Sequence, residues 1–310
     1  MRSLVIYHSA DFDGVMSALV CRKYLLDYRA QNRITLSIYL TGWTYGDEMI
    51  NPDEILRMYD LIYMVDISFP VDIMKKLTDS GKVVWIDHHI TAINDSVQYG
   101  YAGCQGIRRM DVSACEAAWD YLYPNIPCPK LIQYLSAWDI FDKARFDWVG
   151  DVLPLQFSCS ERYGLHPQNW FNDIDRLLQD NETCLEQLIR DGRMIYRYVQ
   201  RRYDNAVSKY GFEVLVDNRL RGICMMSTTF SSLQFMSVLS KYDCCVVVNR
   251  KSNDLYNVSL YIEPSQNTSG IDFNAGEYMK TYYNGGGHKG AAGGLLNFEQ
   301  FTNLVKNQKL

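Results

Sequence analysis

The chain has 310 residues, so two domains are expected, because a single domain usually holds about 100 to 200 residues. Hydrophobic residues make up 47% and charged residues 22%, which excludes a largely disordered chain. The net charge of -5 and the isoelectric point near 5.6 argue against a protein that coats long nucleic acid, since that needs many Lys and Arg contacts with phosphates. A small anionic substrate stays compatible, because a local metal site can supply positive charge.

The cysteines predict a reducing environment. None of the nine belongs to a C-x-x-C pair, which argues against a zinc ribbon or a thioredoxin motif. Their odd number and apolar neighbours, as at Cys244 and Cys245, predict buried, reduced thiols and a cytoplasmic protein. The apolar run at 1–6 is too short for a signal peptide or a membrane span, so we expect neither export nor a membrane partner.

The first part of the chain alternates apolar strands with helices. The predicted strands are 4–7, 36–40, 61–65 and 83–86, and the predicted helices are 15–27, 52–58, 71–78, 113–122 and 130–137. Strands that are apolar throughout and alternate with helices are typical of a parallel sheet with helices on both faces. This pattern predicts an α/β domain.

The second part of the chain has a different pattern. Residues 169–209 are predicted to be mostly helical, and strands are predicted at 212–216, 222–226, 244–249 and 257–262. We therefore expect an N-terminal domain at 1–190, a helical linker at 191–211 and a smaller C-terminal α/β domain at 212–310.

Acidic residues and histidines directly follow three of the predicted strands. They are His8, Asp11 and Asp13 after the first strand, Asp66 after the third, and Asp87, His88 and His89 after the fourth. In open α/β sheets the ligand crevice lies at the carboxyl ends of the strands, so these side chains are expected to converge. Carboxylates and imidazoles are suitable ligands for Mn²⁺ or Mg²⁺.

Each cluster alone also has a structural explanation. Asp13 can cap the following helix, and Asp66 can be an ordinary turn residue. The adjacent pair His88 and His89 is the most specific local signal, because the chain has only five histidines. The preceding Asp87 is of the type that orients a ligating imidazole.

Residues 284–294 form a glycine-rich segment that contains His288 and Lys289. Exposed backbone amides in such a loop can approach an anion closely. The segment matches neither the Walker loop nor the dinucleotide fingerprint. A flexible turn would explain its glycines but not the embedded histidine and lysine.

Taken in this order, the motifs resemble the DHH phosphoesterase superfamily with a C-terminal DHHA1 domain. That group includes oligoribonucleases of the nano-RNase type, RecJ-like exonucleases and family II pyrophosphatases. The resemblance spans nearly the whole chain, with motifs at 8–13, Asp66, 87–89 and Asp139, and the GGGH signature at 285–288. It implies an N-terminal parallel-sheet DHH domain followed by a smaller α/β DHHA1 domain with a mixed sheet. For the fourth motif Asp142 is the alternative to Asp139, and the approach Tyr134 to Trp138 favours Asp139.

The resemblance also implies a centre of two ions, usually Mn²⁺, with Mg²⁺ as the alternative. The implied ligands are Asp66 as the bridge, His8 and Asp11 for one ion, and Asp13, His88 and Asp139 for the other. Asp87 would orient His88, and His89 would contact the substrate phosphate or assist the leaving group. The implied nucleotide-binding residues are Gly285, Gly286, Gly287 and His288.

Two departures from the family pattern leave questions open. The first motif is His-x-x-Asp-x-Asp instead of the common His-x-x-x-Asp-x-Asp, which leaves the role of His8 open. Tyr261 lies in the strand where oligoribonuclease-like members often have an arginine, so the substrate can differ.

The expected function is that of a two-metal phosphodiesterase or phosphohydrolase that converts short RNA or small nucleotides to monophosphates. Both a monomer and a homodimer are compatible with it. One alternative is an inorganic pyrophosphatase or exopolyphosphatase, although only His288 and Lys289 are recognisable cations for a phosphate chain. The other alternative is a non-catalytic nucleotide-binding module.

Overall fold

The computed structural model describes residues 1–179, 182–229, 231–262, 271–287 and 289–306. The chain divides into two compact units, Met1–Tyr196 and Arg197–Leu310. The helix α10 (Glu182–Tyr210) crosses the division between them and contains most of the predicted linker.

The first unit contains a parallel sheet of four strands. They are β1 (Arg2–His8), β2 (Ser37–Trp43), β3 (Leu61–Val65) and β4 (Val83–Ile86), in the order β2-β1-β3-β4. All three neighbouring pairs are parallel, which confirms the predicted α/β fold of this part of the chain.

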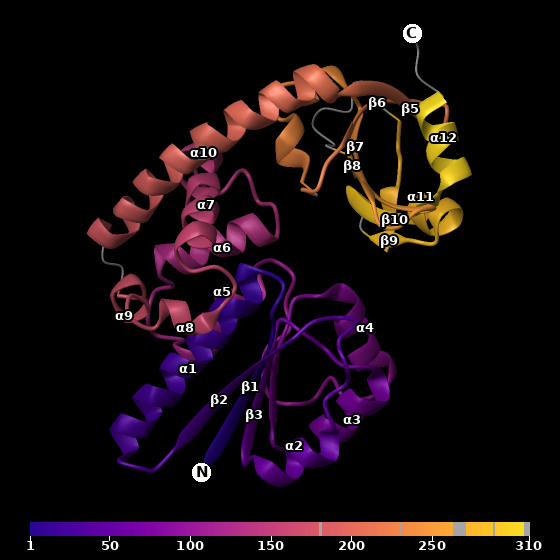
Figure 1. Cartoon of the computed structure of the whole chain (residues 1–310). Coiled ribbons are helices and arrows are strands. Elements are labelled where there is room, and N and C mark those ends of the chain that lie inside the picture. The colour runs from indigo at the N-terminus through magenta and orange to yellow at the C-terminus, as the bar shows by residue number, and fades with distance from the viewer. Residues whose placement is uncertain (180–181, 230, 263–270, 288, 307–310) are drawn as a thin grey trace. The chain divides into compact units, whose positions relative to one another are not determined.

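Helices cover both faces of this sheet (Figure 1). One face packs against α1 (Phe12–Asn32) and α5 (Ala114–Leu122), and the other against α2 (Pro52–Met58), α3 (Val71–Asp79) and α4 (Ile90–Gln98). Within β1, Val5 and Tyr7 belong to the first core, whereas Leu4 and Ile6 belong to the second. Alternate side chains of a strand point to opposite faces, so each strand supplies both cores.

The strand order places a crevice at the ends of β1 and β3. The chain passes from β1 to β2 on one side and then returns to form β3 on the other side of β1. At such a switch point the connections leave in opposite directions and expose the carboxyl ends of the two strands. His8 ends β1 and Asp66 directly follows β3, so both residues lie at this crevice.

The rest of the first unit is helical. Its elements are α6 (Lys130–Asp139), a π-helical turn (Trp148–Val152), α7 (Leu153–Arg162), α8 (Pro167–Trp170) and α9 (Ile174–Leu177). The predicted helical stretch at 169–209 is therefore divided among α8, α9 and α10.

The second unit contains a mixed sheet of six strands, which agrees with the mixed sheet that the resemblance implies; the sequence predicts four of these strands. They are β5 (Phe212–Val216), β6 (Leu220–Met226), β7 (Cys244–Arg250), β8 (Leu255–Ile262), β9 (Gly286–Gly287) and β10 (Ala291–Asn297), in the order β5-β6-β7-β8-β10-β9. Only the β6–β7 pair of these described strands is parallel. Two short 3-10 helices (Ser232–Phe235 and Leu239–Lys241) lie between β6 and β7.

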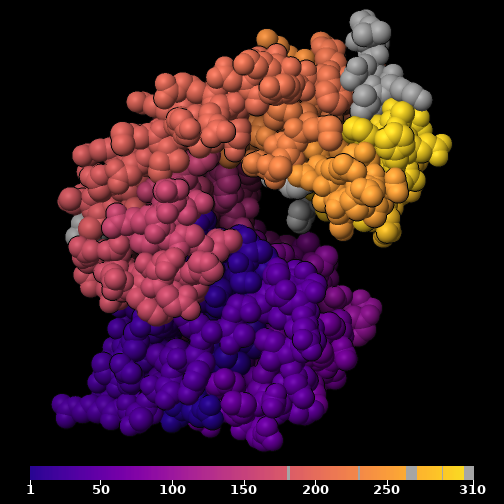
Figure 2. Space-filling model, viewed as in Figure 1, coloured from indigo at the N-terminus to yellow at the C-terminus, as the bar shows by residue number. Residues whose placement is uncertain are grey.

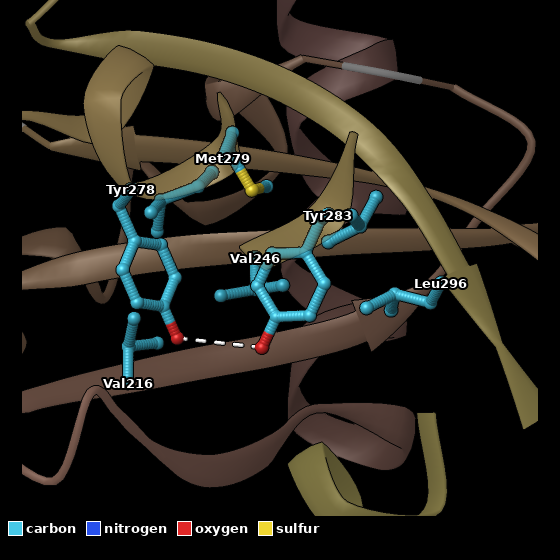
Figure 3. A pocket seen from close by; sticks show the side chains of 8 residues that line it. Val216, Val246, Tyr278, Met279, Tyr283 and Leu296 are labelled. Atoms are coloured by element: carbon cyan, nitrogen blue, oxygen red, sulfur yellow. Dashed lines mark hydrogen bonds between the residues drawn. The ribbon is translucent and has the colours of Figure 1, made fainter. Parts of the chain in front are cut away.

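Two helices complete the second unit, α11 (Ala275–Tyr283) and α12 (Phe298–Lys306), of which α12 lies on the surface in the space-filling view (Figure 2). The α11 residues Tyr278, Met279 and Tyr283 lie over Val246 and Leu296 of the sheet (Figure 3). The Tyr278 and Tyr283 hydroxyls are 3.3 Å apart. The cavity between these side chains is about 10 Å³, which holds at most one water molecule, so it is a packing gap of the core.

The structure corrects the interpretation of residues 284–294 as a loop. Part of this segment is β9 and β10, which pair with each other. A Cβ atom on Gly285 would lie 2.0 Å from the Gly293 carbonyl oxygen, so this glycine is needed for the close approach of the two chain segments. Gly286 has open space around its Cα atom instead, and His288 lies outside the described residues.

The nine cysteines are free thiols, and six of them are buried. Across the described part of the chain, no helix combines the length and apolarity that crossing a membrane requires.

Candidate metal centre

The turn from β1 into α1 brings His8 and Asp11 together. Asp11 caps α1, and its Oδ1 accepts a hydrogen bond from the Gly14 amide at 3.0 Å. A Cβ atom on Gly14 would lie 2.0 Å from the His8 carbonyl oxygen, so only glycine allows this tight turn. The His8 Nδ1 atom then lies 3.0 Å from Asp11 Oδ2 and 3.6 Å from Asp66 Oδ2. On its other side, His8 Nε2 is 3.2 Å from Thr44 Oγ1.

Asp13 is buried and is held by the start of α5. Its Oδ1 accepts hydrogen bonds from Ser113 Oγ at 2.6 Å and from the Cys115 amide at 2.7 Å, and its Oδ2 accepts one from the Ala114 amide at 2.9 Å. The unsatisfied amides of a helix N-terminus stabilise a carboxylate. Asp13 therefore does not cap its own helix, where Asp11 has that role.

Asp66 lies at the centre of the crevice. Its backbone φ is +59°, a left-handed conformation that Asp tolerates better than most residues, and its amide donates to the Ile86 carbonyl at 2.9 Å. The residue is only 1% exposed. Its Oδ1 accepts no hydrogen bond from the residues that the structure describes, and the same holds for the buried His8 Nδ1.

His88 faces three carboxylates at once. Its Nε2 atom lies 3.2 Å from Asp66 Oδ1, 3.6 Å from Asp13 Oδ2 and 3.4 Å from Asp139 Oδ2. Asp139 is the last residue of α6 and thus reaches the centre from a fourth segment of the chain. The alternative acid, Asp142, instead accepts a hydrogen bond from the Ala144 amide at 3.2 Å.

Asp87 orients the ring of His89. Its Oδ1 lies 2.8 Å from His89 Nδ1 and also accepts hydrogen bonds from the backbone amides of His88 and His89. Its Oδ2 accepts a hydrogen bond from the Trp85 indole at 3.2 Å. The expectation that Asp87 orients the His88 ring is therefore wrong. The Asp87 carboxylate accepts a hydrogen bond from the His88 backbone amide, but the ring that it contacts is that of His89.

The side chains form three overlapping groups of potential metal ligands. Their members are His8, Asp11 and Asp66 in the first group, Asp66, His88 and His89 in the second, and Asp13, His88 and Asp139 in the third. Within each group the ligand atoms lie within 4.8 Å of one another. All six residues expected to hold metal are thus in one cluster, whereas the glycine segment belongs to the other unit.

Burial and mutual repulsion oppose the charged forms of Asp66 and Asp139. Burial and the charge of Asp13 raise the pKa of Asp66 well above its usual value, and the same two causes raise the pKa of Asp139 to about 9. Burial opposes the charged form of His8, but the adjacent carboxylates of Asp11 and Asp66 outweigh it and raise its pKa to about 10. Protons on these groups reduce the repulsion among the carboxylates.

The residues present fit divalent cations. The four carboxylates and three imidazoles of these groups are oxygen and nitrogen donors suited to Mn²⁺ or Mg²⁺. The buried Asp66 Oδ1 and His8 Nδ1, which have no hydrogen bond, are atoms that a cation would satisfy.

Two contributors to this site are absent from the sequence-based set. Thr44 directly follows β2, so the rule that sites form at strand ends could have found it. Ser113 contacts Asp13 across 100 residues of sequence, and no local pattern indicates that contact.

Residues 2–136 match the family described as DHH family, N-terminal domain. The N-terminal part of this chain is a DHH domain. The match includes every candidate ligand from His8 to His89 and ends just before Asp139. The chain matches no curated protein.

Solved structures share the fold of this chain. The DHH domain of a member of a family of ribosomal proteins has 16% identity and a TM-score of 0.62, with 100% of this chain and 87% of that chain covered. A pGpG-specific phosphodiesterase, PggH from Vibrio cholerae, has 15% identity and a TM-score of 0.53, with 98% and 96% covered. RecJ from Thermus thermophilus in complex with Mn²⁺ has 15% identity and a TM-score of 0.52, with 99% of this chain and 51% of that chain covered.

Proposed function

We propose that this protein is a metal-dependent phosphohydrolase that cleaves short oligonucleotides or small nucleotides to monophosphates. The observation that carries the proposal is that three groups of potential ligands at one sheet edge share members. Asp66 belongs to two of these groups, and so does His88. A pGpG-specific phosphodiesterase and a Mn²⁺-bound RecJ, which share the fold, support this class of reaction.

We assign the ligands to two ions, Mn²⁺ or Mg²⁺. Asp66 would hold both ions, because its two oxygens face different partners, Oδ2 towards His8 and Oδ1 towards His88. His8 and Asp11 would complete one site, and Asp13, His88 and Asp139 would complete the other. The close contact of His8 with Asp11 supports His8 as a ligand despite the short spacing of the first motif.

When bound, such ions supply Lewis-acid activation of water and stabilise charge on the phosphoryl oxygens. Asp87 fixes the His89 ring through Nδ1, which leaves Nε2 to contact the substrate phosphate or to protonate the leaving oxygen. The hydrogen bond with Asp87 is the largest of the causes that raise the pKa of His89 above its usual value, which favours the protonated form that a proton donor needs.

We assign nucleotide binding in the second unit to Gly285, Gly286, Gly287 and His288. The exposed backbone at Gly286 and Gly287 is of the kind that can donate amide hydrogen bonds to an anion. The carbonyl oxygen of Gly287 would lie 2.3 Å from a Cβ atom on Gly276, so a second glycine is needed to seat this segment beside α11.

A substrate panel tests the function. The full chain loaded with Mn²⁺ is expected to release nucleoside monophosphate from a 5′-phosphorylated dinucleotide, and the metal-free chain is not. Release is followed by chromatography of the products. No turnover of dinucleotides, cyclic dinucleotides or bisphosphorylated nucleotides by the folded, metal-loaded chain would contradict the proposal.

The same panel separates the alternative functions. Release of phosphate from pyrophosphate or polyphosphate, with dinucleotides left intact, would identify a pyrophosphatase or exopolyphosphatase. Saturable nucleotide binding without turnover would identify a non-catalytic binding module. Replacing Asp87 with Ala controls for contaminating enzymes, since activity that belongs to this chain must fall with the loss of the Asp87–His89 contact.

A further inference from the structure

The helix α6 ends in a turn that puts a phenylalanine where glycine is favoured. The Asp142 amide donates to the Ala137 carbonyl at 2.8 Å, and the Phe141 amide donates to the Trp138 carbonyl at 3.2 Å. These two bonds define a Schellman motif, in which the residue at the position of Phe141 is left-handed and is usually glycine. The φ of Phe141 is +61°, so the chain keeps a bulky side chain in a conformation that strains it.

The Phe141 ring contributes little to the core. Its side chain is among the exposed large hydrophobic groups, with 51% exposure. It contacts the edge of Trp148 at a centroid distance of 5.2 Å and an interplanar angle of 73°, and Trp148 stacks on Trp138 at 5.4 Å. The supporting tryptophans hold the phenyl ring in place while more than half of the residue stays accessible.

The position of this ring relates it to the candidate metal centre. Asp139, whose carboxylate approaches His88, is the last residue of α6, and Phe141 follows two residues later in the tight turn. The Lys143 ammonium lies over one face of the Phe141 ring, 4.3 Å from its centroid, so a base would stack on the opposite face. An aromatic surface with a neighbouring cation suits a ligand that has both a flat ring and a phosphate.

We propose that Phe141, supported by Trp148 and Trp138, is a stacking surface for a nucleobase of the substrate. The inference rests on the proposed function and specifies how that site recognises nucleotides. An exposed, strained side chain two residues after a candidate metal ligand is the pattern of a residue kept for binding, since glycine would serve the turn better. Stacking on an aromatic ring tolerates any base, so Phe141 separates nucleotides from base-free phosphates without selecting a sequence.

The test compares the binding of guanosine 5′-monophosphate with that of ribose 5-phosphate, measured by calorimetry on the full chain with Mn²⁺. In the wild type, the dissociation constant for ribose 5-phosphate is expected to exceed that for the nucleotide by about 5- to 150-fold, the range for one stacked base. In Phe141→Gly the ratio falls to near 1, and in Phe141→Tyr it is retained. Phe141→Asn, which also suits a left-handed residue, gives a second variant without the ring.

Arg33→Gly is the matched control. Arg33 is another exposed left-handed residue at a helix end, with φ of +52°. It follows the far end of the 21-residue α1, so the length of that helix, about 30 Å, separates it from the crevice. This variant is expected to keep the wild-type ratio. A wild-type ratio near 1, or a ratio that survives in Phe141→Gly and Phe141→Asn, would overturn the proposal. Because the readout is binding, a chain that fails to hydrolyse dinucleotides fails the proposed function without deciding this inference.

Discussion

At the scale of single residues, Asp66 is the carboxyl group whose buried negative charge a metal ion would neutralise. Its carboxyl group is buried beside Asp13 and within reach of His8 and His88. Burial and the neighbouring charge of Asp13 raise the pKa of Asp66 well above its usual value, which favours the neutral form of this carboxyl group. A bound cation would instead favour its charged form.

The variant Asp66→Asn tests this account. Asn keeps the shape and tolerates the left-handed backbone but cannot bridge two cations as a carboxylate does. The metal-free variant is expected to melt at or above the wild-type temperature, because Asn is neutral without having to bind a proton. Its Mn²⁺-dependent rise in Tm should disappear, and its activity should fall more than about 100-fold, beyond the effect typical of residues that only support a ligand.

Asp217→Asn is the matched control for this change. Asp217 is also a left-handed aspartate, with φ of +53°, and it lies in the second unit. Calorimetric melting with and without Mn²⁺ should show the full metal response in this control. A full response in Asp66→Asn as well would exclude Asp66 as a ligand.

At the scale of elements, α5 provides the support for Asp13. Three donors from its first turn hold the carboxylate, and one of them is the Ser113 hydroxyl, which serves Asp13 and does not cap its own helix. This contact joins the start of α1 to the start of α5, so the packing of two helices on one sheet face fixes one candidate ligand.

Ser113→Ala should weaken both the fold and the site. Loss of the buried hydroxyl is expected to cost about 1 to 3 kcal/mol of unfolding free energy, measured by urea denaturation. Activity should fall about 10- to 100-fold, as for other residues that orient a metal ligand. Ser96→Ala removes a buried hydroxyl whose hydrogen bond within the described part of the chain is to the Ile93 carbonyl, so this variant should keep its activity. Equal losses of activity in the two variants would refute the supporting role of Ser113.

Gly14 tests the turn between β1 and α1. Gly14→Ala would place a methyl group 2.0 Å from the His8 carbonyl oxygen, so the helix must move away from the strand end. The expected cost is about 1 to 3 kcal/mol, with weaker Mn²⁺ binding because His8 and Asp11 separate. Gly103→Ala has open space for its methyl group and should change neither quantity. Unaltered metal binding in Gly14→Ala would show that the turn does not position the ligands.

The sequence predicts this edge of the sheet well because the information is local. Apolar runs predict β1, β3 and β4, and the residues directly after them are fixed at one edge by the parallel arrangement. The contact between Ser113 and Asp13 spans 100 residues and depends on how helices pack, which no periodicity encodes. The sequence pairs Asp87 with the wrong imidazole, since sequence order cannot say which of two adjacent rings turns towards a carboxylate.

The glycine segment shows a different limit. Its composition predicts a loop, but short strands formed by β9 and β10 use the same glycines for close backbone contact. A glycine-rich composition shows that side chains are absent from a segment. It does not show whether a ligand or a neighbouring strand fills the space that they leave.

At the scale of the whole molecule, the proposed chemistry is divided between the two units. The candidate metal ligands lie in Met1–Tyr196, and the proposed glycine segment lies in Arg197–Leu310. Metal and nucleotide should therefore slow amide hydrogen exchange in different segments of the chain. Mass spectrometry can locate these segments, because ligand binding slows exchange in the segments that it stabilises.

With Mn²⁺ alone, slower exchange is expected around His8–Asp13, Asp66 and His88, and not in the second unit. Adding a phosphorothioate dinucleotide that resists hydrolysis should then slow exchange at Gly285–Gly287 as well. The dinucleotide without metal serves as the control and should protect neither region strongly, because the phosphate would face uncompensated carboxylates. Protection confined to the first unit under all conditions would remove the glycine segment from the substrate site and leave nucleotide recognition to the first unit and its Phe141 surface.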